Sequence, residues 1–213
     1  MTRTGLLGGS FNPAHRGHRH ISLAALDALG LDEIWWLISP GNPLKPQKGM
    51  APLAARFASA RRAAAGARIR VTAIERELGT VYTADTLAAL VRRYPRRRFI
   101  WLMGADNLAQ FHRWRDWRKI ASLVPIAVAT RPGYDARALK APAWGWLRRF
   151  VRPAATARNW TMWRPPALVL LSLTPDRTSA TALRAANPDW HDHVTKSFYP
   201  KAVRDDVTRR PLT

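Results

Sequence analysis

The sequence predicts an α/β fold whose core is a doubly wound parallel sheet. Short apolar segments alternate along the chain with longer segments whose apolar residues recur every three or four positions. The short segments are typical of strands that helices cover on both faces, and the longer ones of amphipathic helices. A regular alternation of the two is the pattern of parallel α/β sheets. At 213 residues the chain suits one such domain, with room for an elaboration.

Six apolar segments are expected to be the strands. Each is shorter than a helix of the usual length, and residues 35–38 of the second strand form an apolar run that is expected to be buried. The predicted strands are residues 5–8, 33–39, 69–73, 99–103, 125–129 and 168–173. Ligands of such sheets bind beyond the carboxyl ends of the strands, so the polar segments that follow the strands are expected on one rim.

Three amphipathic segments are expected to be the main helices. The first ends at Gly30, because glycine readily adopts the left-handed conformation of a helix C-terminus. The second opens at Pro52, a residue favoured in a first helical turn, and ends at Gly66. The third starts near Thr83 and stops at Pro95, since proline cannot continue it.

Residues 131–165 break this alternation. They contain four of the ten tryptophans (Trp144, Trp146, Trp160 and Trp163), together with many arginines. We expect an insertion or lid made of short helices, within a single domain that spans residues 1–213. A packed structural flap would have the same composition.

The composition limits the classes of protein. Without cysteine, the chain has no disulfide, no Cys-ligated metal and no Cys nucleophile. No window approaches the length of a membrane span, and the N-terminus runs directly into the first strand, so we expect a cytoplasmic protein without a membrane partner. The formal net charge of +21 favours polyanionic ligands, although arginines scattered over helices would give the same value.

The turn between the first strand and the first helix is the most informative segment. Residues 8–18 read Gly-Gly-Ser-Phe-Asn-Pro-Ala-His-Arg-Gly-His. Free backbone N–H groups at a helix N-terminus bind phosphate. His15 and His18 are three residues apart and share one helix face. The turn therefore predicts a site for a nucleotide triphosphate.

Two common phosphate-binding motifs do not match this turn, and a metal site fits it less well than a phosphate site does. The chain has no Gly-x4-Gly-Lys-Ser/Thr phosphate loop, and the turn does not match the Gly-x-Gly-x-x-Gly dinucleotide fingerprint. A metal cluster of His15, His18 and His20 would lack a nearby carboxylate, since Asp27 and Asp32 are the closest. A purely structural role for the three histidines stays open. For His20 we expect a structural or solvent-exposed role.

The turn resembles the signature of the nucleotidyltransferase superfamily that carries a His/Thr-x-Gly-His motif. It is most similar to the turn of bacterial nicotinate-nucleotide adenylyltransferases. The resemblance implies a Rossmann-like sheet of the nucleotidyltransferase type. It also implies adenylyl transfer from ATP to nicotinate mononucleotide, a step of NAD biosynthesis that yields nicotinate adenine dinucleotide and pyrophosphate.

Four further segments resemble motifs of this family, in the family's order. Residues 82–87 are similar to its Ser-Tyr-Thr-x-Asp-Thr helix start, with Val81 in place of the serine. Residues 179–184 are similar to its Ser-Ser-Thr-x-x-Arg, with Ala180 in place of the second serine. The other two segments are Asn42-Pro43-Leu44-Lys45, and Gly104-Ala105-Asp106 with Trp114 beyond it.

The resemblance implies a role for each matched residue. Those implied to bind ATP are Gly8, Gly9, Ser10, Phe11, His15, His18, Gly104, Asp106, Ser179, Thr181 and Arg184. Those implied to bind nicotinate mononucleotide are Asn42, Lys45, Tyr82, Thr83, Trp114 and Arg115. Those implied in catalysis, as donors to phosphate, are His15, His18, Lys45 and Arg184. No protein ligand to a metal is expected, and Mg²⁺ is expected to arrive with ATP.

The implied chemistry needs positioning more than acid or base. The attacking 5′-phosphate has a second pKa of about 6 and is ionised at neutral pH, so it requires no general base. Asp106 is implied to hold a ribose and Trp114 to stack on the pyridine ring. Backbone N–H groups near Thr83 and Arg115 would favour the nicotinate carboxylate, because an amide NH₂ would leave them unpaired.

Three competing functions stay open. A sister adenylyl- or cytidylyltransferase, acting on nicotinamide mononucleotide or phosphopantetheine, would share His15 and His18. A nucleic-acid-binding protein would use the positive charge and the basic residues 92–98, although we do not expect nucleic acid as the main partner. A binding scaffold would use the tryptophan-rich residues 131–165. The sequence also leaves a homo-oligomer open.

Overall fold

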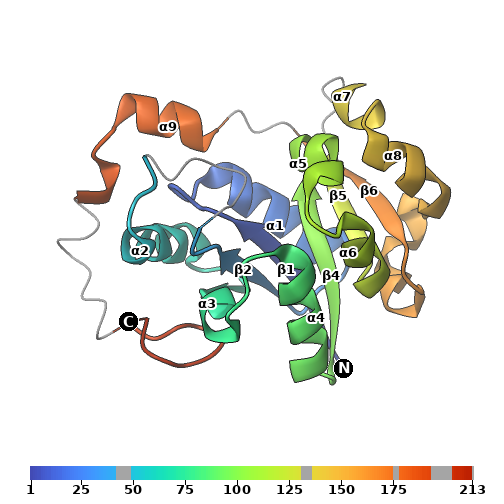
Figure 1. The fold of residues 1–213 in the computed structure, drawn as a ribbon, viewed down its shortest axis with the longest axis horizontal. Coiled ribbons are helices and arrows are strands. Elements are labelled where there is room, and N and C mark those ends of the chain that lie inside the picture. Colours follow the sequence, from blue (N-terminus) through green and yellow to red (C-terminus); the bar gives the residue numbers. More distant parts are fainter. Residues whose placement is uncertain (42–48, 131–135, 175–177, 193–202, 213) are drawn as a thin grey trace. The chain divides into compact units, whose positions relative to one another are not determined.

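A computed structural model describes residues 1–41, 49–130, 136–174, 178–192 and 203–212. Within that part of the chain, six parallel strands form one sheet in the order β3-β2-β1-β4-β5-β6, with flanking helices (Figure 1). The strands are β1 (Thr2–Gly9), β2 (Glu33–Ile38), β3 (Ile69–Thr72), β4 (Arg97–Gly104), β5 (Ile126–Thr130) and β6 (Leu168–Ser172). The predicted α/β fold with a doubly wound parallel sheet is confirmed, and the strand ends differ from the predicted ones by at most three residues.

The three longest α-helices are those that the sequence predicts. They are α1 (Arg16–Ala28), α2 (Leu53–Ala64) and α4 (Thr83–Arg93). Gly30 has a φ of 58° and ends α1 as expected, since its N–H donates to the Asp27 carbonyl. Pro52 directly precedes α2 instead of opening it.

Several short helices were not predicted from the sequence. They are too short to show a helical period in their apolar residues. These helices are α3 (Ile74–Leu78), α5 (Ala105–Gln110), η1 (Phe111–Arg113), α6 (Trp117–Leu123) and α9 (Ala180–Ala186).

The chain divides into two compact units. The first comprises residues 1–7, 21–34 and 82–175, and the second comprises residues 8–20, 35–81 and 176–213. Each unit has its own buried side chains, such as Ile100 in the first and Phe57 in the second.

The strand register of the first unit aligns four buried residues across neighbouring strands. Leu6 lies opposite Trp101, Trp101 opposite Ile126, and Ile126 opposite Leu168. All four are at most 2% exposed. The apolar composition of the central part of these strands agrees with this burial.

Residues 136–165 belong to the first unit and form short helices, as expected. These are α7 (Ala136–Leu139), α8 (Pro142–Leu147), η2 (Arg148–Phe150) and η3 (Ala154–Met162). The Trp160 side chain is 1% exposed, and its Nε1–H donates to the Leu29 carbonyl at 3.1 Å. A buried indole with a satisfied N–H holds η3 against the rest of the unit. The role of these residues as a lid stays a prediction.

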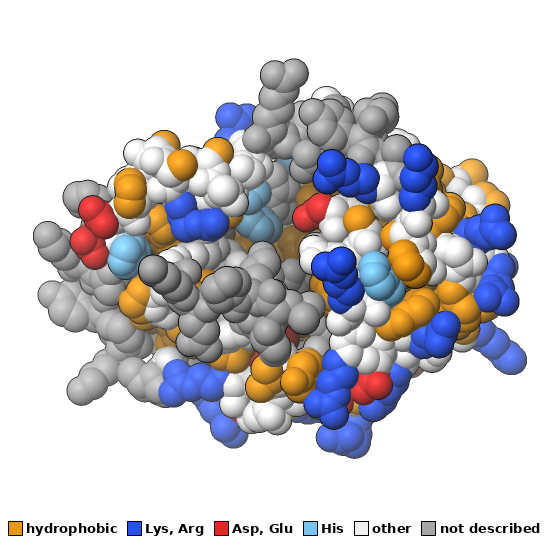
Figure 2. Space-filling view, turned by 45° about the horizontal axis from the view of Figure 1, so that its top comes forward, with side chains coloured by type: hydrophobic (Ala, Val, Ile, Leu, Met, Phe, Trp, Pro, Cys, Tyr) orange, Lys and Arg blue, Asp and Glu red, His pale blue; other side chains and the backbone are white. Residues whose placement is uncertain are grey.

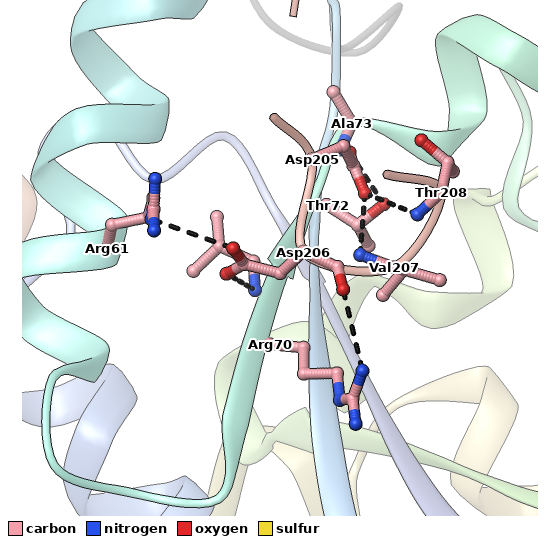
Figure 3. Close-up of polar contacts among 9 residues, drawn as sticks. Arg61, Arg70, Thr72, Ala73, Asp205, Asp206, Val207 and Thr208 are labelled. Carbon is pink, nitrogen blue, oxygen red and sulfur yellow. Dashed lines mark hydrogen bonds and ion pairs between the residues drawn. The ribbon is translucent and has the colours of Figure 1, made fainter. Parts of the chain in front are cut away.

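The C-terminal segment of the second unit binds the edge of β3 (Figure 3). The Asp206 N–H donates to the Val71 carbonyl at 3.2 Å, and the Val71 N–H donates to Asp206 Oδ2 at 3.0 Å. Arg61 of α2 lies 3.6 Å from the other carboxylate oxygen of Asp206. The segment thus covers backbone groups that an open sheet edge would leave unpaired.

The face drawn in Figure 2 carries scattered positive charges. On the face drawn in Figure 2, Lys and Arg side chains lie among hydrophobic and neutral ones. Among the described residues, no helix is both long and apolar enough to cross a bilayer.

We predict that Asp205→Ala lowers the free energy of unfolding by about 2–4 kcal/mol, because buried donors lose their acceptor. Asp205 is buried, with an exposed fraction of 4%. Its carboxylate accepts hydrogen bonds from the Thr72 hydroxyl and from the backbone N–H groups of Ala73, Val207 and Thr208. Urea unfolding measures the change.

The exposed Asp189 provides the control for this variant. Asp189→Ala is expected to leave the urea midpoint unchanged, since its side chain makes no hydrogen bond in the described part of the chain. Equal midpoints for the two variants would contradict the assigned role of Asp205.

Candidate functional site

The turn that follows β1 is shaped by Phe11. The backbone of Phe11 has a φ of 47°, in the left-handed region that bulky residues rarely adopt. Its side chain is 1% exposed, stacks on Trp36 with ring centroids 5.0 Å apart, and lies 4.7 Å from the His18 ring. Burial of the ring offsets a backbone cost of about 1–3 kcal/mol. The hydrophobic core of the second unit therefore fixes the shape of this turn.

The turn has backbone donors without acceptors. Within the described part of the chain, the N–H groups of Ser10 and Phe11 make no hydrogen bond. Gly9 brings the backbone close to the aromatic ring, since a Cβ at this position would lie 3.3 Å from the Phe11 side chain. Consecutive N–H groups in such a turn form a concave surface that suits an anion.

His15 and His18 lie together at the start of α1, as their spacing predicts. Their ring centroids are 3.9 Å apart. The backbone N–H of His15 donates to His18 Nδ1 at 3.2 Å, and the N–H of Gly17 donates to His15 Nδ1 at 3.1 Å. A nitrogen that accepts a hydrogen bond carries no proton, so each neutral ring carries its proton on Nε2. This tautomer makes Nε2–H the donor of each histidine.

Gly17 allows a close approach to these rings. A Cβ on Gly17 would lie 3.0 Å from two atoms of the His15 ring and 3.3 Å from the Thr178 carbonyl oxygen. Thr178, the residue just before the Ser179–Arg184 motif, therefore lies beside Gly17. An alanine at position 17 would require one of these neighbours to move.

Ser179, Thr181 and Arg184 are brought to the same turn by α9. Ser179 caps the helix, because its side chain accepts a hydrogen bond from the Ala182 N–H at 3.2 Å. Arg184 donates to the Asn12 carbonyl at 2.5 Å and to the Thr181 hydroxyl at 3.3 Å. The second unit thus assembles the turn, both histidines and the arginine into one group.

The first unit carries Asp106, the carboxylate of the Gly104-Ala105-Asp106 motif. Gly104 ends β4, and Asp106 lies in the first turn of α5 with its side chain exposed. A Cβ on Gly104 would collide with the Asp106 carboxylate. Glycine at position 104 is therefore needed for this orientation of the carboxylate.

The matched pyridine-nucleotide residues also lie in the first unit. Tyr82 directly precedes α4, whose first residue is Thr83. The Arg115 guanidinium carbon lies 4.5 Å from the centroid of the Tyr82 ring, which is a cation–π distance. Trp114 is half-buried and meets the Phe111 ring edge-on, with centroids 5.4 Å apart. The Arg115 side chain thus lies beside Tyr82, which adjoins Thr83 in the chain.

Two predicted residues, Asn42 and Lys45, lie outside the described residues. The sequence analysis assigned no role to two further residues that contact this turn. Arg56 donates to the Ser10 carbonyl, and the Asn12 carbonyl accepts a hydrogen bond from Arg184. A signal for Arg56 exists in the sequence, because it lies four residues before Ala60 on the apolar face of α2. Among the described residues, no group of three or more His, Asp or Glu could hold a metal ion.

Comparison with known proteins identifies the family. The model of the cytidylyltransferase-like family matches residues 6–186. A relative from Erythrobacter litoralis (strain HTCC2594), named "Probable nicotinate-nucleotide adenylyltransferase", is 63% identical over 99% of this chain and 94% of its own length. The chain therefore belongs to the nicotinate-nucleotide adenylyltransferases, within the cytidylyltransferase-like family. A second relative of the same name, from Bradyrhizobium sp. (strain BTAi1 / ATCC BAA-1182), is 52% identical over 88% of this chain and 98% of its own length.

Solved structures share the fold of this family member. The nicotinic acid mononucleotide adenylyltransferase of Plasmodium falciparum, complexed with NaAD, has a TM-score of 0.65 at 14% identity. The same enzyme complexed with APC has a TM-score of 0.63. Each match covers 92% of this chain and 96% of the other. The likeness supports the nucleotidyltransferase type of parallel sheet.

We predict that the neutral rings of His15 and His18 carry their proton on Nε2, because each Nδ1 accepts a backbone hydrogen bond. Long-range ¹H–¹⁵N correlation spectra of the imidazoles, recorded where both rings are neutral, measure the tautomer. His20 is the internal reference in the same spectra. A proton on Nδ1 of either ring would contradict the assigned geometry.

Proposed function

We propose that the protein transfers the adenylyl group of ATP to nicotinate mononucleotide and forms nicotinate adenine dinucleotide, a step of NAD biosynthesis. The observation that carries this proposal is the group formed by the turn, His15, His18 and Arg184 in the second unit. It occurs in a chain that is 63% identical to a relative named for this activity.

The reaction is a single displacement at phosphorus. An oxygen of the mononucleotide 5′-phosphate forms a bond to the α-phosphorus of ATP, and the bond from that phosphorus to the bridging oxygen breaks. The electron pair leaves with pyrophosphate. No proton has to be removed from the nucleophile, because the phosphate with a second pKa of about 6 is already ionised. Mg²⁺ enters as part of the substrate, as the magnesium complex of ATP.

The triphosphate is assigned to the second unit. The N–H groups of Ser10 and Phe11, which have no acceptor among the described residues, supply donors fixed by the backbone, together with Nε2–H of His15 and His18. Donors that need no reorganisation stabilise charge more effectively than water does. Arg184 is already anchored on the turn and adds a positive charge as negative charge moves to the leaving group. Gly8, Gly9, Ser179 and Thr181 shape this group.

The mononucleotide is assigned to Tyr82, Thr83, Trp114 and Arg115, with Asn42 and Lys45 for its phosphate. The N–H of Thr83 belongs to the first turn of α4, where the helix leaves donors for a carboxylate. The Arg115 guanidinium, held on the Tyr82 ring, adds a positive charge at the same place. Both features favour the acid over the amide. Asp106, oriented by Gly104, is assigned to a ribose.

A direct assay tests this function. The protein is incubated with ATP, Mg²⁺ and either nicotinate mononucleotide or nicotinamide mononucleotide, and pyrophosphate release is measured. We expect a kcat/KM for the acid that exceeds that for the amide by at least about tenfold, the effect of leaving one or two donors unpaired. A higher kcat/KM for the amide would assign the protein to a sister activity. So would pyrophosphate release that occurs only when phosphopantetheine replaces the mononucleotide.

We predict that Trp114→Ala raises the KM for nicotinate mononucleotide by about tenfold or more, because stacking on a ring contributes about 1–3 kcal/mol. The KM for ATP should change little. Steady-state kinetics with each substrate varied in turn measures both values.

Trp117→Ala is the matched control for this variant. Trp117 also meets Phe111 edge-on, with centroids 5.8 Å apart, yet it is not assigned to the substrate. Its loss should leave both KM values close to those of the wild type. Equal increases in both KM values for Trp114→Ala would contradict stacking on the pyridine.

A further inference from the structure

Two consecutive backbone N–H groups of the turn after β1, those of Ser10 and Phe11, have no acceptor among the described residues. The carbonyls of the same two peptides are both occupied. The Gly9 carbonyl accepts a hydrogen bond from the Ser39 N–H at 3.0 Å, and the Ser10 carbonyl accepts one from the Arg56 guanidinium at 2.8 Å. Because the C=O and N–H of a trans peptide point in opposite directions, each N–H points away from the group that binds its carbonyl.

The two peptides are held by different kinds of group. A backbone N–H at the end of β2 holds the Gly9–Ser10 peptide, and it is present whatever the side chain at position 39. For the Ser10–Phe11 peptide, Arg56 is the one donor to the carbonyl in the described part of the chain. The orientation of the second peptide therefore depends on a side chain.

The Ser10–Phe11 peptide also has a reason to rotate. Phe11 has a φ of 47°, in the left-handed region that is unfavourable for a bulky residue. Rotation of the peptide plane would bring this φ to a negative value while the Phe11 side chain stays in the core. It would also turn the N–H inwards and point the Ser10 carbonyl oxygen at the place assigned to the phosphates. The hydrogen bond from Arg56 opposes this rotation.

Arg56 itself is fixed in place by burial and by further hydrogen bonds. It is 1% exposed, although α2 is otherwise rich in alanine. Its guanidinium also donates to the carbonyls of Ala51 at 2.9 Å, Ser39 at 2.7 Å and Pro40 at 3.4 Å. A side chain with so many fixed partners holds the Ser10 carbonyl in one direction.

The burial of this arginine is costly for the fold. Among the described residues, no Asp or Glu forms an ion pair with Arg56, and removal from water lowers the pKa of its guanidinium below the ordinary value. An apolar side chain would fill the same space with less penalty. An arginine at this position therefore calls for a role that an apolar side chain cannot fulfil, and several diverging carbonyls need its planar set of donors.

We propose that Arg56 is a positioning residue for the triphosphate, because it holds the Ser10–Phe11 peptide in the orientation that presents the Phe11 N–H to the anion. The inference rests on the proposed function, since it takes the turn after β1 as the triphosphate site. Arg56 does not touch the ligand and acts through the peptide alone. A donor fixed in this way needs no reorganisation when the triphosphate binds.

NMR spectroscopy of the full-length protein tests which amides bind the anion. A sample labelled with ¹⁵N at serine and phenylalanine is titrated with a non-hydrolysable ATP analogue and Mg²⁺. In the wild type we expect the amide proton resonances of Ser10 and Phe11 to move downfield, because each N–H gains a charged acceptor. A Phe11 resonance that stays unchanged at saturation would overturn the inference without the need for a variant.

Arg56→Lys and Arg56→Met separate orientation from charge. Lysine keeps the charge but lacks the planar fork of donors, and methionine removes both. At saturating analogue, we expect both variants to lose the Phe11 response and to keep the Ser10 response, because the Ser39 N–H still binds the Gly9 carbonyl. The Kd for the analogue should rise by about tenfold or more, the effect of losing one hydrogen bond to a charged group.

Two results with these variants would overturn the inference. A Phe11 response that persists in Arg56→Lys would show that charge alone matters. Loss of the Ser10 and Phe11 responses together would show a general loosening of the turn instead of the rotation of one peptide.

Arg19→Met is the matched control. Arg19 also donates to two backbone carbonyls of the second unit, those of Ala63 and Ala65, at 2.9 Å and 2.8 Å. Neither carbonyl belongs to the turn, so both amide responses should persist and the Kd should stay within about twofold of the wild type. A rise in Kd as large as that of Arg56→Met would contradict a specific role of Arg56.

The titration also separates this inference from the proposed function. A wild type whose Ser10 and Phe11 amides respond to the analogue, but which forms no dinucleotide from nicotinate mononucleotide, would overturn the proposed function alone. The comparison of Arg56→Lys with the wild type would then still decide on Arg56. A wild type in which neither amide responds would overturn the inference, whatever reaction the protein catalyses.

Discussion

The candidate site depends on the burial of Phe11. Its ring contacts the rings of both Trp36 and His18, and this position requires a left-handed backbone at φ 47°. This backbone turns the Ser10 carbonyl towards Arg56 and leaves the neighbouring N–H groups without acceptors in the described chain. The Phe11 ring also supports the His18 ring at 4.7 Å. A hydrophobic contact therefore sets the directions of the polar groups that we assign to the triphosphate.

The site that we propose for the triphosphate presents hydrogen-bond donors rather than acids and bases. Backbone hydrogen bonds fix the histidines as Nε2–H donors, and the arginines are anchored on carbonyls. Such groups are oriented before the substrate arrives, so little reorganisation accompanies the movement of charge to pyrophosphate. An enzyme whose nucleophile is already ionised gains most from this kind of arrangement.

The large positive charge has a structural component. With 35 Lys and Arg against 14 Asp and Glu, most arginines cannot pair with a carboxylate. Several donate to backbone carbonyl oxygens instead: Arg19 to those of Ala63 and Ala65, Arg76 to that of Leu212, and Arg98 to that of Thr161. Guanidinium groups suit this role because they present several donors in one plane. This use of arginine accounts for part of the charge without a nucleic-acid partner.

The sequence by itself determined the parallel α/β fold, the three main helices and the turn with its two histidines. These features are local, since they follow from apolar periodicity, from the cap at Gly30 and from residues that are adjacent in the chain. Only the tertiary structure decided which nitrogen of each histidine donates, that Arg184 binds the Asn12 carbonyl, and that Arg56 is buried beneath the turn. The physical reason is that these contacts depend on where the folded chain places each donor and acceptor, and no periodicity records where a carbonyl oxygen from another segment will lie.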